Sequence, residues 1–403
     1  MEQAEARAGQ DGSPGEVFAA FLRLGLTSFG GPIAHLGYFR NEFVERRGWL
    51  DESAYADLVA LCQFLPGPAS SQVGFALGLR RAGLLGALAA FVAFTLPSAT
   101  VLVLFAYGAA LLDGPVAQGA IDGLKIVAVA IVAQAVWGMA RTLCPDRQRA
   151  GIALGAIAMV ALVAGALGQI AAIGAGAVAG AILVRNGPAV AAMPMRFGVS
   201  PVLGATALVV FAALLFGIPL LLTVWPDRAL ALFDAFYRAG ALVFGGGHVV
   251  LPLLEAETVA RGWVGADSFL AGYGAAQAVP GPLFTFAAYL GAVVVPEPNG
   301  IPGALIALVA IFLPGFLLLV GVMPFWDAFR RRAWAQATMA GANAAVVGIL
   351  AAALYDPVFT SAVTSPLAFA LAATGFVLLT VFRVSPWIVV VASALGGVVI
   401  GAM

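Results

Sequence analysis

Apolar segments long enough to cross a lipid bilayer recur along the whole chain, and this feature constrains the fold more than any other. Hydrophobic residues make up 62% of the 403 residues and charged residues only 10%, whereas a soluble domain carries about a quarter charged residues. Strand-like alternation of polar and apolar residues is absent, which argues against a membrane β-barrel. We therefore expect an all-α, polytopic membrane protein with about 12–13 apolar segments.

Two parts of the chain carry the same residues in the same order, which indicates an internal duplication. The matching pairs are FAAFLRLG (18–25) with FDAFYRAG (233–240), Phe-Gly-Gly (29–31 with 244–246), Glu42 with Glu257, Arg-Gly-Trp (47–49 with 261–263), Gln63 with Gln277, and Pro-Gly-Pro (66–68 with 280–282). We call residues 17–184 copy one and residues 230–403 copy two. A cytoplasmic tail (1–16) precedes copy one, and a linker with one extra transmembrane helix (185–229) separates the copies.

The number of segments predicts that the two copies have opposite orientations in the membrane. The expected segments are 17–39, 53–78, 83–111, 119–140, 151–167 and 169–184 in copy one, 203–224 in the linker, and 230–251, 265–291, 301–324, 335–354, 363–382 and 386–402 in copy two. Because each copy holds an even number of segments and the linker one, copy two should enter the membrane from the other side.

Arginine residues in the loops support the inversion, because cytoplasmic loops are rich in Arg and Lys. Loops 79–82 and 141–149 of copy one are basic, whereas their counterparts 292–300 and 355–362 are not. The reverse holds for the loop between them: 112–118 lacks arginine, and its counterpart 325–333 carries Arg330, Arg331 and Arg332. We expect a cytoplasmic N-terminus and a periplasmic C-terminus. Loop 40–52 is cytoplasmic if segments 17–39 and 53–78 each dip in and return, and outside if each crosses once.

The Pro-Gly-Pro sequences interrupt apolar segments and predict paired half-helices. A half-helix that starts near Ala69 directs free N–H groups and the positive end of its dipole at the interior, which is how a membrane protein builds an anion site. A structural kink is the alternative. The candidate residues here are Pro66, Gly67, Pro68, Ser70 and Ser71 in copy one, and Pro280, Gly281, Pro282 and Thr285 in copy two.

The Phe-Gly-Gly turns and two arginines complete the predicted substrate site. Adjacent glycines let a ligand or another backbone approach, although close helix packing also uses glycine. Arg23 and Arg238 occupy matching positions in apolar segments, and two guanidinium forks suit a tetrahedral dianion; snorkelling to the interface is the alternative. The turn residues are Ser28, Phe29, Gly30 and Gly31, and Phe244, Gly245 and Gly246.

A few ionisable residues occur in one copy only and are candidates for ion coupling. Lys125, the only lysine, follows Asp122 by one turn, and its counterpart in copy two is Asn343. A simple ion pair is the alternative. The remaining candidates are Asp57 and His248. For His248, and for His35 beside the first Phe-Gly-Gly, the alternative to a proton carrier is a buried polar residue with its hydrogen bonds satisfied. His, Cys and acidic residues do not cluster as in a metal site, and Cys62 and Cys144 are expected to be packing residues. The sequence implies no cofactor, and no basic tract suggests binding of nucleic acid.

The stretches SFGGPIAHL, RGWLDESAYADLVALCQFLPGPASSQ, FGGGHVVLPLLEAE and AAQAVPGP resemble the chromate ion transporter family in its long, two-domain form. That resemblance covers nearly the whole chain. It implies export of chromate across the inner membrane, driven by the proton gradient and giving chromate resistance. Some members are linked to sulfate, which has the shape and charge of chromate, and a homodimer is one form in which such a carrier could assemble.

Two other classes of function are compatible with parts of the sequence. A membrane-embedded enzyme resembling a lipid pyrophosphate phosphatase also uses inverted repeats, helix breaks and Arg. Such chemistry needs an acid–base or nucleophile cluster beside the Arg, and Ser70 and Ser71 lack a base. A passive channel is the third reading, but two buried arginines would slow release and favour a carrier.

Overall fold

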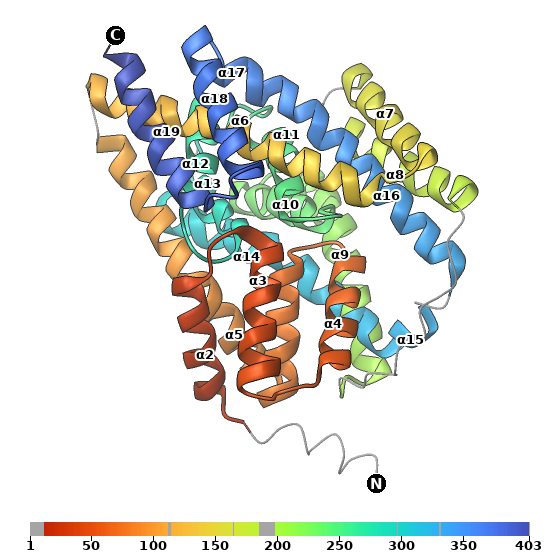
Figure 1. Cartoon of the computed structure of the whole chain (residues 1–403). Helices are drawn as coiled ribbons and strands as arrows, with labels where there is room; N and C mark the ends of the chain where they lie inside the picture. The colour runs from red at the N-terminus through yellow and green to blue at the C-terminus, as the bar shows by residue number, and fades with distance from the viewer. Residues whose placement is uncertain are drawn as a thin grey trace.

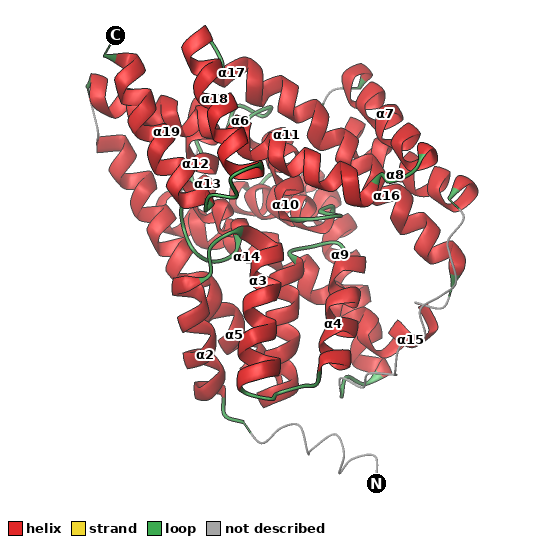
Figure 2. Ribbon diagram, in the orientation of Figure 1, coloured by secondary structure: helices red, strands yellow, loops and turns green. Residues whose placement is uncertain are grey.

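The computed structural model describes residues 12–111, 114–163, 165–184, 198–295, 297–329 and 332–402. Within these ranges the protein consists of helices and connecting loops, without strands (Figures 1 and 2). Six helices are long and apolar enough to cross a membrane. These observations confirm the expected all-α, polytopic membrane fold. Most of the tail (1–11), part of the linker (185–197) and the arginines at 330 and 331 lie outside the described residues.

The first two segments of copy one enter the protein and return to the same face. They form α2 (Pro14–Thr27), α3 (Gly31–Phe39), the π-helical segment η1 (Arg40–Arg46), α4 (Glu52–Phe64) and the start of α5 (Ala69–Leu111). Glu16 at the start of α2 lies 3.8 Å from Arg47 and 3.2 Å from Arg81. The N-terminal end, loop 40–52 and the bend of α5 at Ala82–Gly83 therefore share one face, and segments 17–39 and 53–78 each fold back to the face where they begin.

The matching part of copy two forms a series of shorter helices. Its elements are α10 (Arg228–Ala241), η2 (Gly247–Val249), α11 (Val250–Thr258), α12 (Ala266–Ala276), η3 (Leu283–Thr285), α13 (Phe286–Val293) and α14 (Gly300–Val322). The amide of Val295 donates to the carbonyl of Trp263 at 2.8 Å, so the loops after α11 and α13 meet. The helices of the second pair therefore also enter and return.

The equivalent long helices α5 and α14 run antiparallel. Phe91, early in the second half of α5, stacks edge-on against Phe316 in the later part of α14, with ring centroids 5.1 Å apart. Tyr107, near the end of α5, lies beside Gly300, the first residue of α14. Both helices contain an internal proline, Pro97 in α5 and Pro314 in α14.

The remaining helices of each copy pack against the other copy. They are α6 (Pro115–Leu143), α7 (Arg147–Leu162) and α8 (Ala166–Leu183) in copy one, and α16 (Ala333–Ala353), α18 (Pro366–Thr380) and α19 (Pro386–Gly401) in copy two. Helix α6 packs against α18 and α19, whereas α16 packs against α7 and α8 (Figure 1). Small residues allow these crossings, since Gly123 meets the backbone of Ser393 and Gly341 that of Gly180.

The extra helix α9 (Pro201–Val224) lies at the edge of the fold. Only 11% of its most apolar stretch is buried, against 33% to 61% in the other long helices. We infer that most of its surface faces lipid. Short elements complete the described chain: η4 (Met323–Phe325), α15 (Trp326–Phe329), η5 (Leu354–Phe359) and α17 (Thr360–Ala362).

Candidate functional site

The two Pro-Gly-Pro breaks each bind the Phe-Gly-Gly turn of the other copy. The amide of Gly67 donates to the carbonyl of Val243 at 2.7 Å, and the amide of Gly281 donates to the carbonyl of Ser28 at 2.9 Å. Val243 and Ser28 are equivalent residues, each directly before its Phe-Gly-Gly. The four motifs that the sequence singled out therefore form one region where the copies meet.

Both breaks are also in close contact with the proline-kinked helix of the opposite copy. A Cβ at Gly67 would lie 3.0 Å from Cα of Gly315 in α14, and one at Gly281 would lie 2.9 Å from Oγ of Ser98 in α5. Both glycines have positive φ, 123° and 102°. Glycine is required there for its conformation and for the close approach of a second backbone.

The Phe-Gly-Gly turns need glycine mainly for conformation. Gly30, Gly31, Gly245 and Gly246 all have positive φ. A Cβ at Gly31 or Gly246 would meet nothing within 4 Å, so close helix packing does not explain these two residues. Phe29 reaches the other copy instead, with its ring centroid 6.4 Å from that of Trp387 in α19.

The half-helix predicted after the first break begins at Ala69, as the sequence indicated. Its first backbone hydrogen bond runs from the amide of Gln72 to the carbonyl of Pro68 at 2.9 Å. The amides of Ala69, Ser70 and Ser71 lie before that bond and have no acceptor within the helix. They form the positive end of the helix dipole. This helix start can therefore act as a donor to an anion.

In copy one, buried polar side chains lie at this helix start and on the segments next to it, since the ring of Phe94, beside Thr95, contacts that of His35. His35 is fully buried; its Nε2 lies 3.2 Å from the carbonyl oxygen of Ser28, and its Nδ1 lies 3.4 Å from Oγ of Ser70. The hydroxyls of Ser28, Ser71 and Thr95 are buried and have no hydrogen-bond partner among the described residues. Buried hydroxyls normally have partners, so three unpartnered ones indicate a place for a polar ligand. We call Ser28, His35, Ser70, Ser71 and Thr95 the copy-one polar cluster.

Copy two has apolar residues at most of the equivalent positions. Val243 replaces Ser28, Val250 replaces His35, Phe284 replaces Ser70 and Phe312 replaces Thr95. All four are buried. Thr285, the counterpart of Ser71, donates its hydroxyl to the carbonyl of Pro282 at 2.7 Å. The copy-two break is thus filled by side chains and already satisfied.

The two arginines lie in different surroundings. The expectation of two buried arginines is wrong for Arg23, which is exposed on α2. Arg238 lies 3.1 Å from both Asp234 and Glu257, and Glu257 also pairs with Arg261 at 2.5 Å. Carboxylates already balance the charge of Arg238, and Arg23 takes no part in this ion-pair group. Their role as oxyanion ligands stays a prediction.

The candidates for ion coupling are distributed over several helices. Lys125 is nearly buried and pairs with Asp122 at 2.6 Å, as the spacing indicated, and also with Asp267 of α12 at 3.1 Å. The second acid belongs to copy two, so this ion pair connects the copies. His248 lies in η2 and its Nδ1 is 2.8 Å from the hydroxyl of Tyr273. Asp57 is buried in α4.

Sequence reasoning missed several residues that the fold brings into this region. Gln72 donates its amide to the carbonyls of Pro66 at 3.1 Å and Gly315 at 2.9 Å, which fixes the first break against α14. Thr95 and Asp267 were also missed. Gln72 and Thr95 are polar at positions where copy two has Phe286 and Phe312, and this mismatch was the signal that could have found them. Asp267 corresponds to Ser53 in copy one and left no such signal. No group of His, Cys, Asp and Glu able to hold a metal ion occurs in the described part of the chain.

Comparisons with known proteins identify the family. The sequence profile described as chromate transporter matches residues 15–181 and 230–398, which lie in both copies. A chromate transport protein of Pseudomonas aeruginosa is 30% identical over 348 residues, covering 85% of this chain and 80% of that protein. One of Cupriavidus metallidurans is 27% identical over 386 residues, covering 94% and 91%. A probable chromate transport protein of Synechococcus elongatus is 28% identical over 355 residues, covering 83% and 82%.

No solved structure matches the chain. The relatives named above are transport proteins, and the match extends over both copies, so the expected class of transporter rather than enzyme is confirmed. The chain belongs to the chromate transporter family.

Proposed function

We propose that the chain is a secondary active transporter that exports chromate across the inner membrane, using the proton gradient. The observation that carries this proposal is the meeting of both helix breaks with the opposite Phe-Gly-Gly turns, beside three unpartnered buried hydroxyls. The chromate transport proteins among the relatives support the substrate.

The anion would bind at the start of α5. The amides of Ala69 to Ser71 and the hydroxyls of Ser28, Ser71 and Thr95 are donors that suit a tetrahedral dianion with four oxygens. His35 would position the Ser70 hydroxyl through the contact at 3.4 Å. The copy-two break would serve as the packing partner, because Thr285 is already bonded to Pro282.

The proposed transport cycle rests on inverted copies, with the N-terminus cytoplasmic and the C-terminus periplasmic. The antiparallel course of α5 and α14 supports the inversion, and the basic loops support the cytoplasmic N-terminus. In such proteins one repeat moves against the other around a fixed midplane site. The ion pair of Lys125 with Asp267 crosses between the copies and is a candidate for proton coupling, together with Asp122, Asp57 and His248.

Transport into everted vesicles tests this function. Vesicles that contain the protein should accumulate labelled chromate when a pH gradient is imposed, and an uncoupler should abolish the accumulation. Labelled sulfate, run in parallel, tests the alternative substrate, since both anions are tetrahedral and doubly charged. Chromate uptake that is equal with and without the gradient would exclude proton coupling, and uptake of sulfate alone would replace chromate as the substrate.

A further inference from the structure

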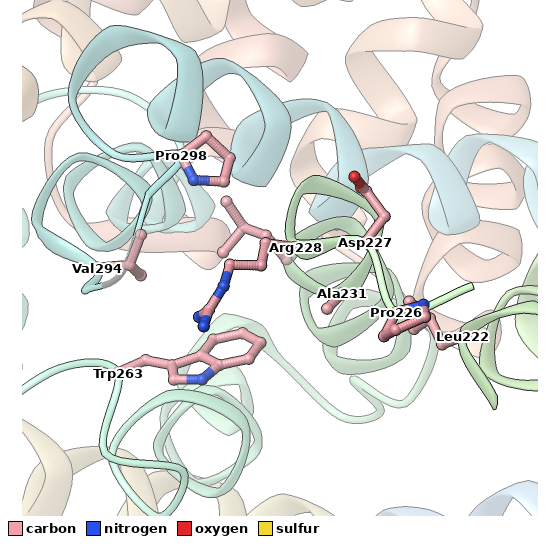
Figure 3. Close-up of a pocket in the computed structure, with 9 residues that line it drawn as sticks. Leu222, Pro226, Asp227, Arg228, Ala231, Trp263, Val294 and Pro298 are labelled. Atoms are coloured by element: carbon pink, nitrogen blue, oxygen red, sulfur yellow. The ribbon is translucent and has the colours of Figure 1, made fainter. Parts of the chain in front are cut away.

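A cavity of about 340 Å³ opens where α9 ends and α10 begins (Figure 3). Its size lies at the lower end of the range for small-molecule sites, about 300–1,000 Å³. The walls come from the end of α9, the start of α10 and the two loops of copy two that meet at Trp263. The lining residues are Leu222, Pro226, Asp227, Arg228, Ala231, Leu232, Trp263, Val294 and Pro298.

Arg228 is the cation of this cavity. Its guanidinium points toward the indole of Trp263, and Asp227 is directed away from it (Figure 3). The Asp227 carboxylate caps α10 by accepting the amide of Leu230 at 2.7 Å. No ion pair of Arg228 occurs among the residues that the structure describes, whereas Arg261, which lies over the Trp263 ring, is paired with Glu257.

The equivalent place in copy one is occupied by an ion pair. There Arg81 lies over Trp49, 5.3 Å from the ring centroid, and bonds Glu16 at 3.2 Å. Counted from the matched motifs, Val295 stands in copy two where copy one has Arg81, and Ala231 where it has Glu16. The cavity therefore lies where copy two lacks both members of the pair.

We propose that this cavity binds the phosphate group of an anionic phospholipid. Guanidinium groups bind phosphate through paired hydrogen bonds, and Trp is typical of the membrane interface. Six of the nine lining residues are apolar, which suits the glycerol and the first methylenes of a lipid but gives an inorganic anion no further donors. The adjacent end of α9 is strongly exposed, Val224 at 83% and Trp225 at 69%, as expected for a surface in contact with lipid.

Lipid binding to the purified full-length protein tests the proposal. Native mass spectrometry and thermal unfolding are measured with phosphatidylglycerol, with zwitterionic phosphatidylcholine and with inorganic phosphate. We expect phosphatidylglycerol alone to bind and to raise Tm. Arg228→Gln should weaken its binding by about tenfold or more, the loss of a charged hydrogen bond. Ala231→Leu should have a similar effect by filling the cavity without removing a charge.

Arg141→Gln is the matched control, because Arg141 is also exposed but lies at the far end of α6. It should bind phosphatidylglycerol as the wild type does. Equal binding by Arg228→Gln and Ala231→Leu would overturn the site. Equal stabilisation by inorganic phosphate would overturn the lipid assignment and leave a site for free oxyanions. Neither outcome depends on whether the protein transports chromate.

Discussion

At the residue scale, the hydroxyls of the copy-one polar cluster give the sharpest test of the substrate site. Ser28→Ala, Ser71→Ala and Thr95→Val each remove one buried, unpartnered donor. A hydrogen bond to a charged group contributes about 1.5–3 kcal/mol, so each change should weaken chromate binding roughly 10- to 100-fold. The measurement is the concentration dependence of chromate uptake. Thr285→Ala is the control, because that hydroxyl is bonded to Pro282, and its uptake should be close to that of the wild type.

Matched residues identified the motifs that meet where the copies join, but not the unmatched polar residues beside them. Glu42 and Glu257 match because each pairs with the arginine of its Arg-Gly-Trp, Arg47 at 2.6 Å and Arg261 at 2.5 Å. Each pair spans only four or five residues, so their shared role is to fix the chain locally at the start of the Arg-Gly-Trp. The residues left with free hydroxyls, such as Ser28 and Thr95, have no polar match in the other copy. Matching the two copies could not single out Thr95, whereas Ser28 was included as a residue of the turn.

The Glu42 ion pair predicts a pH dependence of stability. Partial burial acts to raise the pKa of Glu42, but hydrogen bonds and charges from Arg47 and Arg46 lower it below its ordinary value of 4.5. A lowered pKa stabilises the fold above the unfolded-state pKa, and the effect is lost as pH falls through the folded-state pKa. Glu42→Gln should therefore cost about 1.5 kcal/mol at neutral pH, with the Tm difference closing below pH 4.5. Glu45→Gln, which affects only an exposed pair with Arg40, should change Tm little at any pH.

At the scale of the element, the first helix break depends on Gly67 in two ways, for its backbone conformation and for its close contact with α14. Gly67→Ala adds a methyl group at a positive φ and crowds Gly315. Gly48→Ala has a positive φ as well, but open space around the new methyl group. The strain of the left-handed α conformation costs roughly 1–2 kcal/mol at Gly48. At Gly67 the φ of 123° lies outside that region, so the strain is at least as large, and overpacking adds about 1–3 kcal/mol. We expect Gly67→Ala to lower Tm further and to lose transport, whereas Gly48→Ala transports normally. Equal losses in both variants would mean that crowding against α14 plays no part.

The elements themselves were largely predictable, and their partners were not. Proline and glycine predicted the start of α5 at Ala69, because they stop one helix and leave the next uncapped. The bonds from Gly67 to Val243 and from Gly281 to Ser28 join backbone atoms, and backbone atoms leave no signal in side-chain identity. Whether segments 17–39 and 53–78 cross or return was likewise decided by tertiary contacts of Glu16.

At the scale of the whole molecule, the basic loops and the face shared by the N-terminal end and loop 40–52 predict which surfaces face the cytoplasm. Single cysteines are introduced into a variant without Cys62 and Cys144, at the exposed positions Glu45, Val116 and Val295. An impermeant thiol reagent added outside should label Val116→Cys and Val295→Cys but not Glu45→Cys until the membrane is opened. Labelling of Glu45→Cys from outside would contradict a cytoplasmic N-terminal face.

The exchange of helices between the copies predicts that neither copy folds alone. Helix α6 has its packing partners in α18 and α19, and α16 has its partners in α7 and α8, so each half on its own exposes a face shaped for the other. A chain cut within 185–197 should give two fragments that copurify and transport chromate when they are expressed together. Either fragment alone should aggregate or be degraded.

A pair of glycines on one helix shows whether this packing holds the halves together. Gly123 meets the backbone of Ser393, whereas a methyl group added at Gly138 on the same helix would meet nothing within 4 Å. Gly123→Leu should therefore force α6 away from α19 and abolish copurification of the fragments, since close approach of small residues drives helix association in membranes. Gly138→Leu should leave copurification intact. A stable, monodisperse fragment of residues 1–184 would show instead that the copies are independent domains, and the exchanged helices would then be a docking surface rather than a shared core.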